Sequence, residues 1–369
     1  MYKRISFTSL ALMALCLLNT PGQALDLTSG LKTGTVKLSS AGPIGFGPQG
    51  ILFVGDTKAA QICAIDTGDT KGNPEKASIN VKGLNQVIAS LLGTEAADVM
   101  INDLAVNPAS GNTYVSASSS RGPDARPALL RVSTAGKVSV VSLKNVKHAT
   151  AKLPNPPAPG GTGRRNLRSQ SITDLAYIDG RVIVAGLSNE EFASNLRAIP
   201  FPFSKVDNGT GIEIFHGAHG RFETRSPVRT FTSYLIDKKP HLLAAYTCTP
   251  LVKFPLSKLK SGSKVQGTTI AELGNRNRPL DMFVYTKQGK DYILMANSSR
   301  GVMKITTDDL ATQTPITKRV EGGKPAGQAY DTIERLKGIV QLDRLNSSHA
   351  IVLVESDGGA VDLSTVELP

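Results

Sequence analysis

The sequence predicts an all-β fold, and within that class a β-propeller of six four-stranded blades. A unit of three short apolar strands, joined by a tight polar turn and then by a longer loop, recurs six times along the chain. The units begin roughly 50 to 70 residues apart, a period typical of a radial array of small sheets. Gly, Asn and Asp bound the strands, as hairpin turns require. The units start near Gly42, Ile101, Ile172, Arg229, Pro279 and Leu336.

The three main strands of each unit follow from the local pattern of apolar residues. The first strands read GPIGFGP, INDLAVNP, ITDLAYID, RTFTSYLID, PLDMFVYT and LKGIVQLD. The second strands read ILFVGDT, TYVSASS, RVIVAGLS, HLLAAYTC, YILMANSS and HAIVLVES. The third strands read QICAIDT, ALLRVST, LRAIPFPF, PLVKFPL, GVMKIT and GAVDLST. Short apolar runs bounded by turn residues indicate buried strands rather than helices.

The fourth strands are weaker. The candidates for units one to five are ASINVKG, KVSVVSL, IEIFHG, TTIAEL and PITKRVE, and unit six runs out at residues 361–368. The N-terminal segment at residues 34–38 has no partner in unit one. We therefore expect it to pair with the C-terminal blade and close the ring, which removes an exposed sheet edge. Seven blades are the alternative, if residues 25–40 and the C-terminus share more strands.

The N-terminus carries the pattern of a secretory signal peptide. Two basic residues precede an apolar run at residues 10–18, and a small-residue cleavage pattern ends at Ala24. The run is far short of the ~20 residues that span a bilayer, which argues against a membrane anchor. We expect residues 1–24 to be removed on export to the periplasm or the medium. Residues 25–369 would then form a single propeller domain.

The two cysteines of the mature chain, Cys63 and Cys248, are not expected to form a disulfide. They fall in units one and four, which in a six-membered ring are expected to face each other across the channel. A disulfide needs Cα atoms within ~7 Å. There is no CxxC or CxxCH motif, so neither a thiolate zinc site nor c-type haem is encoded. No cofactor is predicted, and a divalent metal is kept as the alternative.

Arginine and lysine separate by face. Loops that lead into first strands, or join second to third strands, lie on one side of a propeller, here called the top face. Arginine, whose planar fork binds carboxylate, sulfate or phosphate through two parallel bonds, predominates there, and lysine on the opposite face. This predicts an anion-binding top face; the alternative is that the arginines pair with acids and brace the loops. The top-face set is Arg121, Arg126, Arg164, Arg165, Arg168, Arg221, Arg225, Arg229, Arg276, Arg278, Arg300 and Arg335.

Three top-face segments do not recur between units. The first, residues 216–225, places two histidines close to Glu223, which suits zinc, copper or acid/base chemistry. The other two, at residues 274–279 and 296–301, are rich in Asn and Arg. We expect the three to converge over units four and five, with loop bracing as the alternative. The candidate catalytic residues are His216, His219 and Glu223, and the candidate ligand-binding residues are Arg221, Arg225, Arg229, Asn275, Arg276, Arg278, Asn297 and Arg300.

Three aspartates, Asp103, Asp174 and Asp281, occupy equivalent positions at the start of first strands. A ring of carboxylates near the channel mouth has the hard oxygen ligands that a divalent cation prefers. Alternatively, these side chains cap strand backbones or form salt bridges with neighbouring arginines. Recurrence in several blades favours the structural role.

The segment GPQGILFVGDTKAAQICAID resembles an NHL-type repeat, and INDLAVNPASGNTYVSASSS is similar to it. The wider likeness is to secreted six-bladed NHL-like and TolB-like propellers and covers nearly the whole mature chain. The resemblance implies the fold. Members of such families bind proteins or polyanions, or are metal-dependent lactonases or lyases with carboxylate and amide ligands at the channel mouth. The resemblance implies, by position alone, that the corresponding ligands here are Asp103, Asp174, Asp281 and Asn297. No family signature is matched.

Two functions follow as hypotheses. The first is an exported, monomeric binding protein whose top face recognises an anionic small molecule, a polyanion or a protein partner. The second is a hydrolase or lyase, with or without a metal, that uses His216 or His219 at the channel mouth. No Gly-x-Ser-x-Gly elbow supports a serine nucleophile. Despite a net charge of +12, nucleic-acid binding is not expected, because the chain has no tryptophan and no basic run interleaved with aromatics. No later segment predicts a membrane span.

Overall fold

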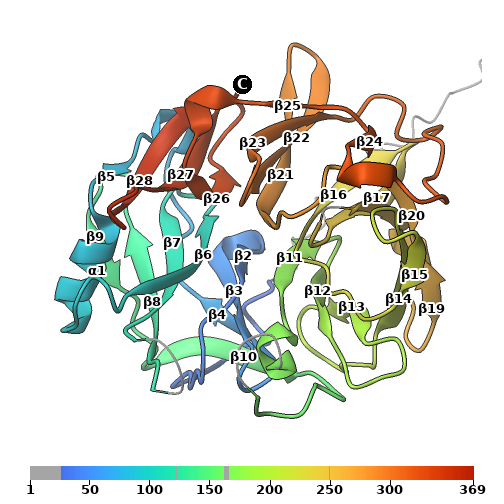
Figure 1. Cartoon of the computed structure of the whole chain (residues 1–369). Coiled ribbons are helices and arrows are strands. Elements are labelled where there is room, and N and C mark those ends of the chain that lie inside the picture. The colour runs from blue at the N-terminus through green and yellow to red at the C-terminus, as the bar shows by residue number, and fades with distance from the viewer. Residues whose placement is uncertain (1–25, 121–123, 162–165, 249) are drawn as a thin grey trace, which may run out of the picture.

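The computed structural model describes residues 26–120, 124–161, 166–248 and 250–369, and Figure 1 shows six sheets arranged around a central axis. The prediction of an all-β, six-bladed propeller is confirmed. Each blade is a four-stranded antiparallel sheet, and blades one, three and four carry additional edge strands. The signal peptide expected at residues 1–24 lies outside the described residues.

The strands fall close to the predicted runs. The innermost strands, for blades one to six, are β2 (Ile44–Phe46), β6 (Met100–Val106), β11 (Asp174–Ile178), β16 (Thr230–Ile236), β21 (Pro279–Lys287) and β26 (Ile339–Arg344). The second strands are β3 (Ile51–Asp56), β7 (Thr113–Ser118), β12 (Arg181–Leu187), β17 (Lys239–Ala245), β22 (Lys290–Asn297) and β27 (His349–Glu355). The third strands are β4 (Gln61–Asp66), β8 (Pro127–Val132), β13 (Ser194–Pro200), β18 (Pro250–Pro255), β23 (Gly301–Thr306) and β28 (Val361–Glu367).

The outer elements are shorter. The fourth strands, for blades one to six, are β10 (Val146–Lys152), β9 (Val138–Val140), β14 (Thr210–His216), β20 (Thr268–Glu272), β25 (Tyr330–Thr332) and β5 (Asn80–Val81). The additional edge strands are β1 (Lys32–Gly34), β15 (Arg221–Glu223), β19 (Lys264–Gln266) and β24 (Ala326–Gly327). The helix α1 (Leu84–Leu92) and the short helices η1 (Pro48–Gly50), η2 (Pro74–Lys76), η4 (Leu167–Gln170), η5 (Leu256–Lys258), η6 (Glu321–Gly323) and η7 (Glu334–Leu336) lie in connections.

The blades do not follow chain order around the ring. Blade one lies between blades two and three, because β2 contacts both β6 and β11, while β6 also contacts β26 of blade six. The apolar clusters between blades give the same order: one cluster joins blade one to blade two, and another joins blade one to blade three. The ring therefore reads two, one, three, four, five, six (Figure 1).

The ring also closes in a different way from the one that the sequence predicted. The chain leaves blade one before its fourth strand, and β5 instead pairs with β28 of blade six, where Val81 lies opposite Leu363. The fourth strand of blade one is β10, which follows blade two and pairs with β4. The predicted closure by residues 34–38 is wrong, since β1 pairs with β10 inside blade one. A fourth strand of blade one within residues 77–83 is wrong for the same reason.

Two further details differ from expectation. The fourth strand of blade five is β25, paired with β23, and residues 315–321 form no strand; Ile316 donates its backbone N–H to Thr269 of blade four instead. Blades one and four are separated by blade three and do not face each other across the channel. Cys63, which is buried, and Cys248, which is half-buried, are both free thiols.

No helix in the described part of the chain combines the length and apolar character that a membrane span needs.

Candidate functional site

Four arginines surround one cavity of about 730 Å³ on the top face. Arg225 and Arg229 come from the segment that leads into β16, and Arg276 and Arg278 from the segment that leads into β21. Thr247 adds a residue from a connection between second and third strands. The predicted convergence of the loops over blades four and five therefore brings these guanidinium groups to one place, which we call the arginine cavity.

The arginines of this cavity are not neutralised by neighbouring acids. Arg229 is held by neutral groups: its Nε donates to Thr247 Oγ1 at 3.1 Å and its Nη2 donates to Gln170 Oε1 at 3.1 Å. Burial, together with the positive charge of Arg278, lowers the pKa of Arg229 to about 10. Within the described ranges, the arginines with a carboxylate within 4.0 Å are Arg131, Arg181, Arg221 and Arg319. The arginine cavity is therefore a cationic site whose charges remain available.

Three of the predicted ligand-binding residues brace the loop beside the cavity. Arg300 Nη2 donates to the backbone oxygen of Asn275 at 3.2 Å. Asn297 is buried, its Oδ1 accepts the backbone N–H of Arg300 at 3.2 Å, and its Nδ2 donates to Asn277 Oδ1 at 3.3 Å. The bracing alternative thus describes Asn275, Asn297 and Arg300, whereas Arg276 and Arg278 are exposed toward solvent. The predicted top-face residues Arg121, Arg164 and Arg165 lie outside the described residues.

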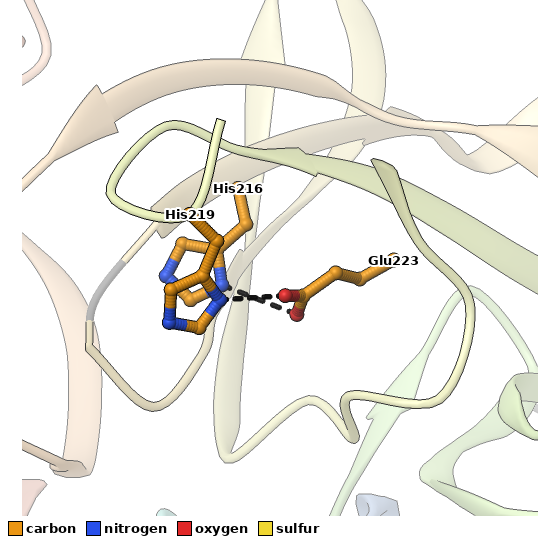
Figure 2. Close-up of side chains that lie close together, drawn as sticks. All are labelled: His216, His219 and Glu223. Atoms are coloured by element: carbon orange, nitrogen blue, oxygen red, sulfur yellow. Dashed lines mark hydrogen bonds and ion pairs between the residues drawn. The ribbon is translucent and has the colours of Figure 1, made fainter. Parts of the chain in front are cut away.

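The histidine cluster, His216, His219 and Glu223, forms at the hairpin between β14 and β15. His216 Nδ1 lies 3.2 Å from Glu223 Oε2, and His219 Nδ1 lies 2.6 Å from Glu223 Oε1. Figure 2 shows the two imidazoles side by side, both turned toward the carboxylate, and their centroids are 3.8 Å apart. Gly220, with a φ of 66°, takes the left-handed conformation that the tight hairpin requires.

The histidine cluster lies away from the channel mouth, contrary to expectation. β15 is the outermost strand of its sheet, and the cavity of about 490 Å³ beside the cluster is lined by residues between His219 and Ser226 alone. β14 pairs with β13 at Thr210 and Gly211, and its later residues pair with β19 and β15 at the outer edge of the sheet, which places the hairpin at the outer rim (Figure 1). Arg225 and Ser226 line both this cavity and the arginine cavity, so the two sites are neighbours.

The charges at the histidine cluster favour an ionised Glu223. Burial opposes that charge, yet hydrogen bonds from His216, Ser226 and His219 together hold the pKa of Glu223 well below its usual range. The exposed Arg221 lies 3.5 Å from the same carboxylate. Beneath the hairpin, burial raises the pKa of Glu272 to about 7, although its Oε1 accepts the backbone N–H of Gly217 at 2.5 Å.

One atom of the histidine cluster has no partner. His216 is 2% exposed, and its Nε2 is buried without a hydrogen bond in the described structure. A neutral His216 that donates from Nδ1 to Glu223 carries a lone pair on Nε2, which is the form that binds transition metals. Among the described residues, this cluster is the one set of three or more His, Cys, Asp or Glu side chains whose ligand atoms all lie within 4.8 Å of one another.

The three predicted aspartates line a channel cavity of about 700 Å³ and tie neighbouring blades together. In each case Oδ2 accepts a backbone N–H from the innermost strand of the next blade, and Oδ1 accepts the backbone N–H of the following residue. The bonds to the next blade are Ile44 to Asp103 at 2.8 Å, Phe231 to Asp174 at 2.8 Å and Leu342 to Asp281 at 3.2 Å. These contacts correspond to the alternative role, in which the three aspartates cap the backbones of neighbouring strands.

Asp343 joins this channel group, and the sequence reasoning missed it. Its Oδ2 accepts the backbone N–H of Val106 at 2.7 Å, linking blade six to blade two. Asp343 stands near the end of its strand instead of the start, so the repeat position did not reveal it. Burial raises the pKa of all four carboxyls, to about 7 for Asp174 and about 6 for Asp343, and well above the usual range for Asp103 and Asp281.

No protein-family model and no curated protein matches the sequence. Solved structures match over most of the chain. The PQQ-bound aldose sugar dehydrogenase from Streptomyces coelicolor is 14% identical with a TM-score of 0.36, and the match covers 91% of this chain and 96% of that one. Drosophila semaphorin 1b, extracellular domains 1–2, is 10% identical with a TM-score of 0.40, covering 92% and 87%. A putative oxidoreductase (glucose dehydrogenase) from Thermus thermophilus is 13% identical with a TM-score of 0.36, covering 91% and 100%.

These values are too low to carry an argument about function. The expected resemblance to NHL-like and TolB-like propellers stays a prediction.

Proposed function

We propose that this propeller binds an anionic ligand in the arginine cavity. The observation that carries the proposal is the set of four guanidinium groups, Arg225, Arg229, Arg276 and Arg278, around one opening with no carboxylate within 4.0 Å in the described residues. An anion that enters the cavity relieves the repulsion between these arginines, and its oxygens accept hydrogen bonds from the guanidinium groups, so binding is favourable. We further propose that the protein is exported, on the signal peptide expected at residues 1–24.

The exposed pair Arg276 and Arg278 offers the test. Sulfate binding, measured by calorimetry in low-salt buffer, is expected to weaken about 10- to 100-fold in Arg276→Ala/Arg278→Ala. Each charged hydrogen bond contributes about 1.5–3 kcal/mol, and screening by solvent reduces that contribution at an exposed site. Binding by the unchanged protein should also weaken as sodium chloride is added.

A matched control removes two arginines from the opposite face. Arg181 lies at the β11–β12 hairpin and Arg344 ends β26, so Arg181→Ala/Arg344→Ala changes the net charge equally. If this control loses sulfate affinity to the same extent, the attraction comes from net charge and not from the arginine cavity. Sulfate binding that is absent or insensitive to salt would also contradict the proposal.

A second candidate function rests on the histidine cluster. We infer that His216, His219 and Glu223 hold a divalent transition metal such as zinc. Two imidazoles and a carboxylate form a ligand set that suits zinc and leaves a position for water or substrate. The ligand atoms of all three side chains lie within 4.8 Å of one another, which supports this inference.

Zinc titration tests the second candidate. The purified protein is expected to bind about one Zn²⁺ per chain by calorimetry and to ignore Mg²⁺, which prefers oxygen ligands. His216→Gln should reduce zinc affinity at least about tenfold, as loss of one of three ligands does, while His241→Gln, near the start of β17, should leave it unchanged. Equal zinc uptake by His216→Gln and the unchanged protein would exclude the cluster as the metal site.

A further inference from the structure

The channel mouth continues from the arginine cavity into a second cavity. This cavity of about 900 Å³ opens beside blades two, five and six, and apolar residues make up most of its lining, among them Met100, Leu280 and Val340, one from the innermost strand of each of these blades. Polar residues, including Gln341 and Glu355, complete the lining. Met100 is 38% exposed, so its side chain can be reached by a molecule in this cavity. We call this the apolar cavity.

Shared residues show that the cavities adjoin. Ser298 lines both the arginine cavity and the apolar cavity. A third cavity, of about 380 Å³, joins the two, since it is lined by Met100 together with Arg229 and Arg278. The top of the channel is therefore one depression, which arginines line over blades four and five and mostly apolar residues line over blades five, six and two.

The geometry points to an amphiphilic anion as the ligand: one acidic group attached to an apolar chain or ring system. This inference rests on the proposed function, because the arginine cavity supplies the contact for the acidic group. Apolar side chains such as Met100 would cover the rest of the molecule, which releases water from both surfaces. An inorganic anion or a polyanion would leave the apolar cavity unused.

The inference predicts how much the apolar part of the ligand adds to the binding affinity. Each buried methylene contributes about 0.8 kcal/mol, close to a fourfold change in affinity. Burying three or four methylenes therefore makes octane-1-sulfonate bind about 100-fold tighter than methanesulfonate, although both present the same anionic group. The neutral analogue 1-octanol lacks the contact with the arginines and should bind much more weakly than octane-1-sulfonate.

Calorimetry with these three probes, below micellar concentrations, tests the inference. Met100→Asn should lower the affinity for octane-1-sulfonate about tenfold, because a polar amide replaces the apolar contact, and leave that for methanesulfonate unchanged. Leu91→Asn is the control, since Leu91 is 44% exposed on α1 but is not among the residues that line the apolar cavity. Circular dichroism melts of both variants establish that they are folded. Arg276→Ala/Arg278→Ala should weaken both sulfonates.

The outcomes separate the two claims. Equal affinities for octane-1-sulfonate and methanesulfonate, both lost in the arginine variant, would overturn the amphiphile and leave the anion site standing. Loss of affinity in Leu91→Asn equal to that in Met100→Asn would also overturn the inference. If neither sulfonate binds, the proposed function and this inference are overturned together.

Discussion

Replacing Asp69 by alanine is expected to lower the free energy of unfolding by about 3–5 kcal/mol, as loss of one partner from a buried charged network does. Asp69 is 8% exposed and accepts hydrogen bonds from Ser110 Oγ at 3.0 Å, Asn112 Nδ2 at 2.9 Å and Tyr114 OH at 3.1 Å. Alanine leaves these donors buried without an acceptor. Chemical denaturation followed by circular dichroism measures the change.

The loss of stability expected for Asp69→Ala arises at the contact between blades one and two. Asp69 belongs to the segment that leaves β4, and its three partners lie in or next to β7 of blade two. Nearby, a Cβ on Gly72 would collide with the backbone of Ser110, so the segment lies directly against blade two. Asp66→Ala is the control, because its carboxylate accepts the backbone N–H of Gly68 in an exposed turn. Similar small losses in both variants would show that Asp69 does not secure this contact.

The second large effect is a dependence of stability on pH that originates in the channel. The pKa of Asp174 is raised from 3.8 to about 7, mainly by burial. The folded state therefore binds this proton more tightly than the unfolded state, so the contribution of Asp174 to stability is greatest below about pH 4 and falls as the pH rises toward 7. One pKa unit corresponds to about 1.4 kcal/mol, and we expect Asp174 to account for about 2–4 kcal/mol across this window.

Asp174→Asn tests this dependence, because the amide stays neutral. The variant should lose less stability than the unchanged protein between about pH 4 and pH 8, measured as the free energy of unfolding in urea at each pH. Asp179→Asn, at the exposed hairpin after β11, removes a carboxyl from the same blade and should leave the profile unchanged. Parallel profiles for Asp174→Asn and the unchanged protein would count against a titrating carboxyl at this position.

The sequence predicted the innermost, second and third strands of all six blades, because their apolar runs are continuous and lie next to one another in the chain. It did not predict the partner of β5 or of β10. Two residues, Asn80 and Val81, form β5, and a pattern that short carries no information about a partner in the last blade of the chain. Reading repeats in chain order assumes local closure, and the exchange of fourth strands between blades breaks that assumption.

The arginine cavity was predictable for a related reason. The loops that carry Arg225, Arg229, Arg276 and Arg278 lie on a face that the strand count alone sets, and blades four and five are neighbours both in the chain and in the ring. The position of the histidine cluster was not predictable, because it depends on the pairing of β14 with β15 and β19 at the outer edge of the sheet. Gln170 and Thr247, which orient Arg229, gave no signal in the sequence because single polar residues are common in loops.

Because blades one and six take their fourth strands from distant parts of the chain, the blades of this ring are not independent sequence units. Blade six is completed by Asn80 and Val81, which emerge early in synthesis, and blade one waits for β10. A growing chain therefore holds an open blade one until Lys152 is available, and the ring cannot seal before β28 has been made. Deleting blade one at the N-terminus would therefore not leave a closed ring with one blade fewer. It would remove the sheet that lies between blades two and three, and the chain connects those two blades only through β10 of blade one.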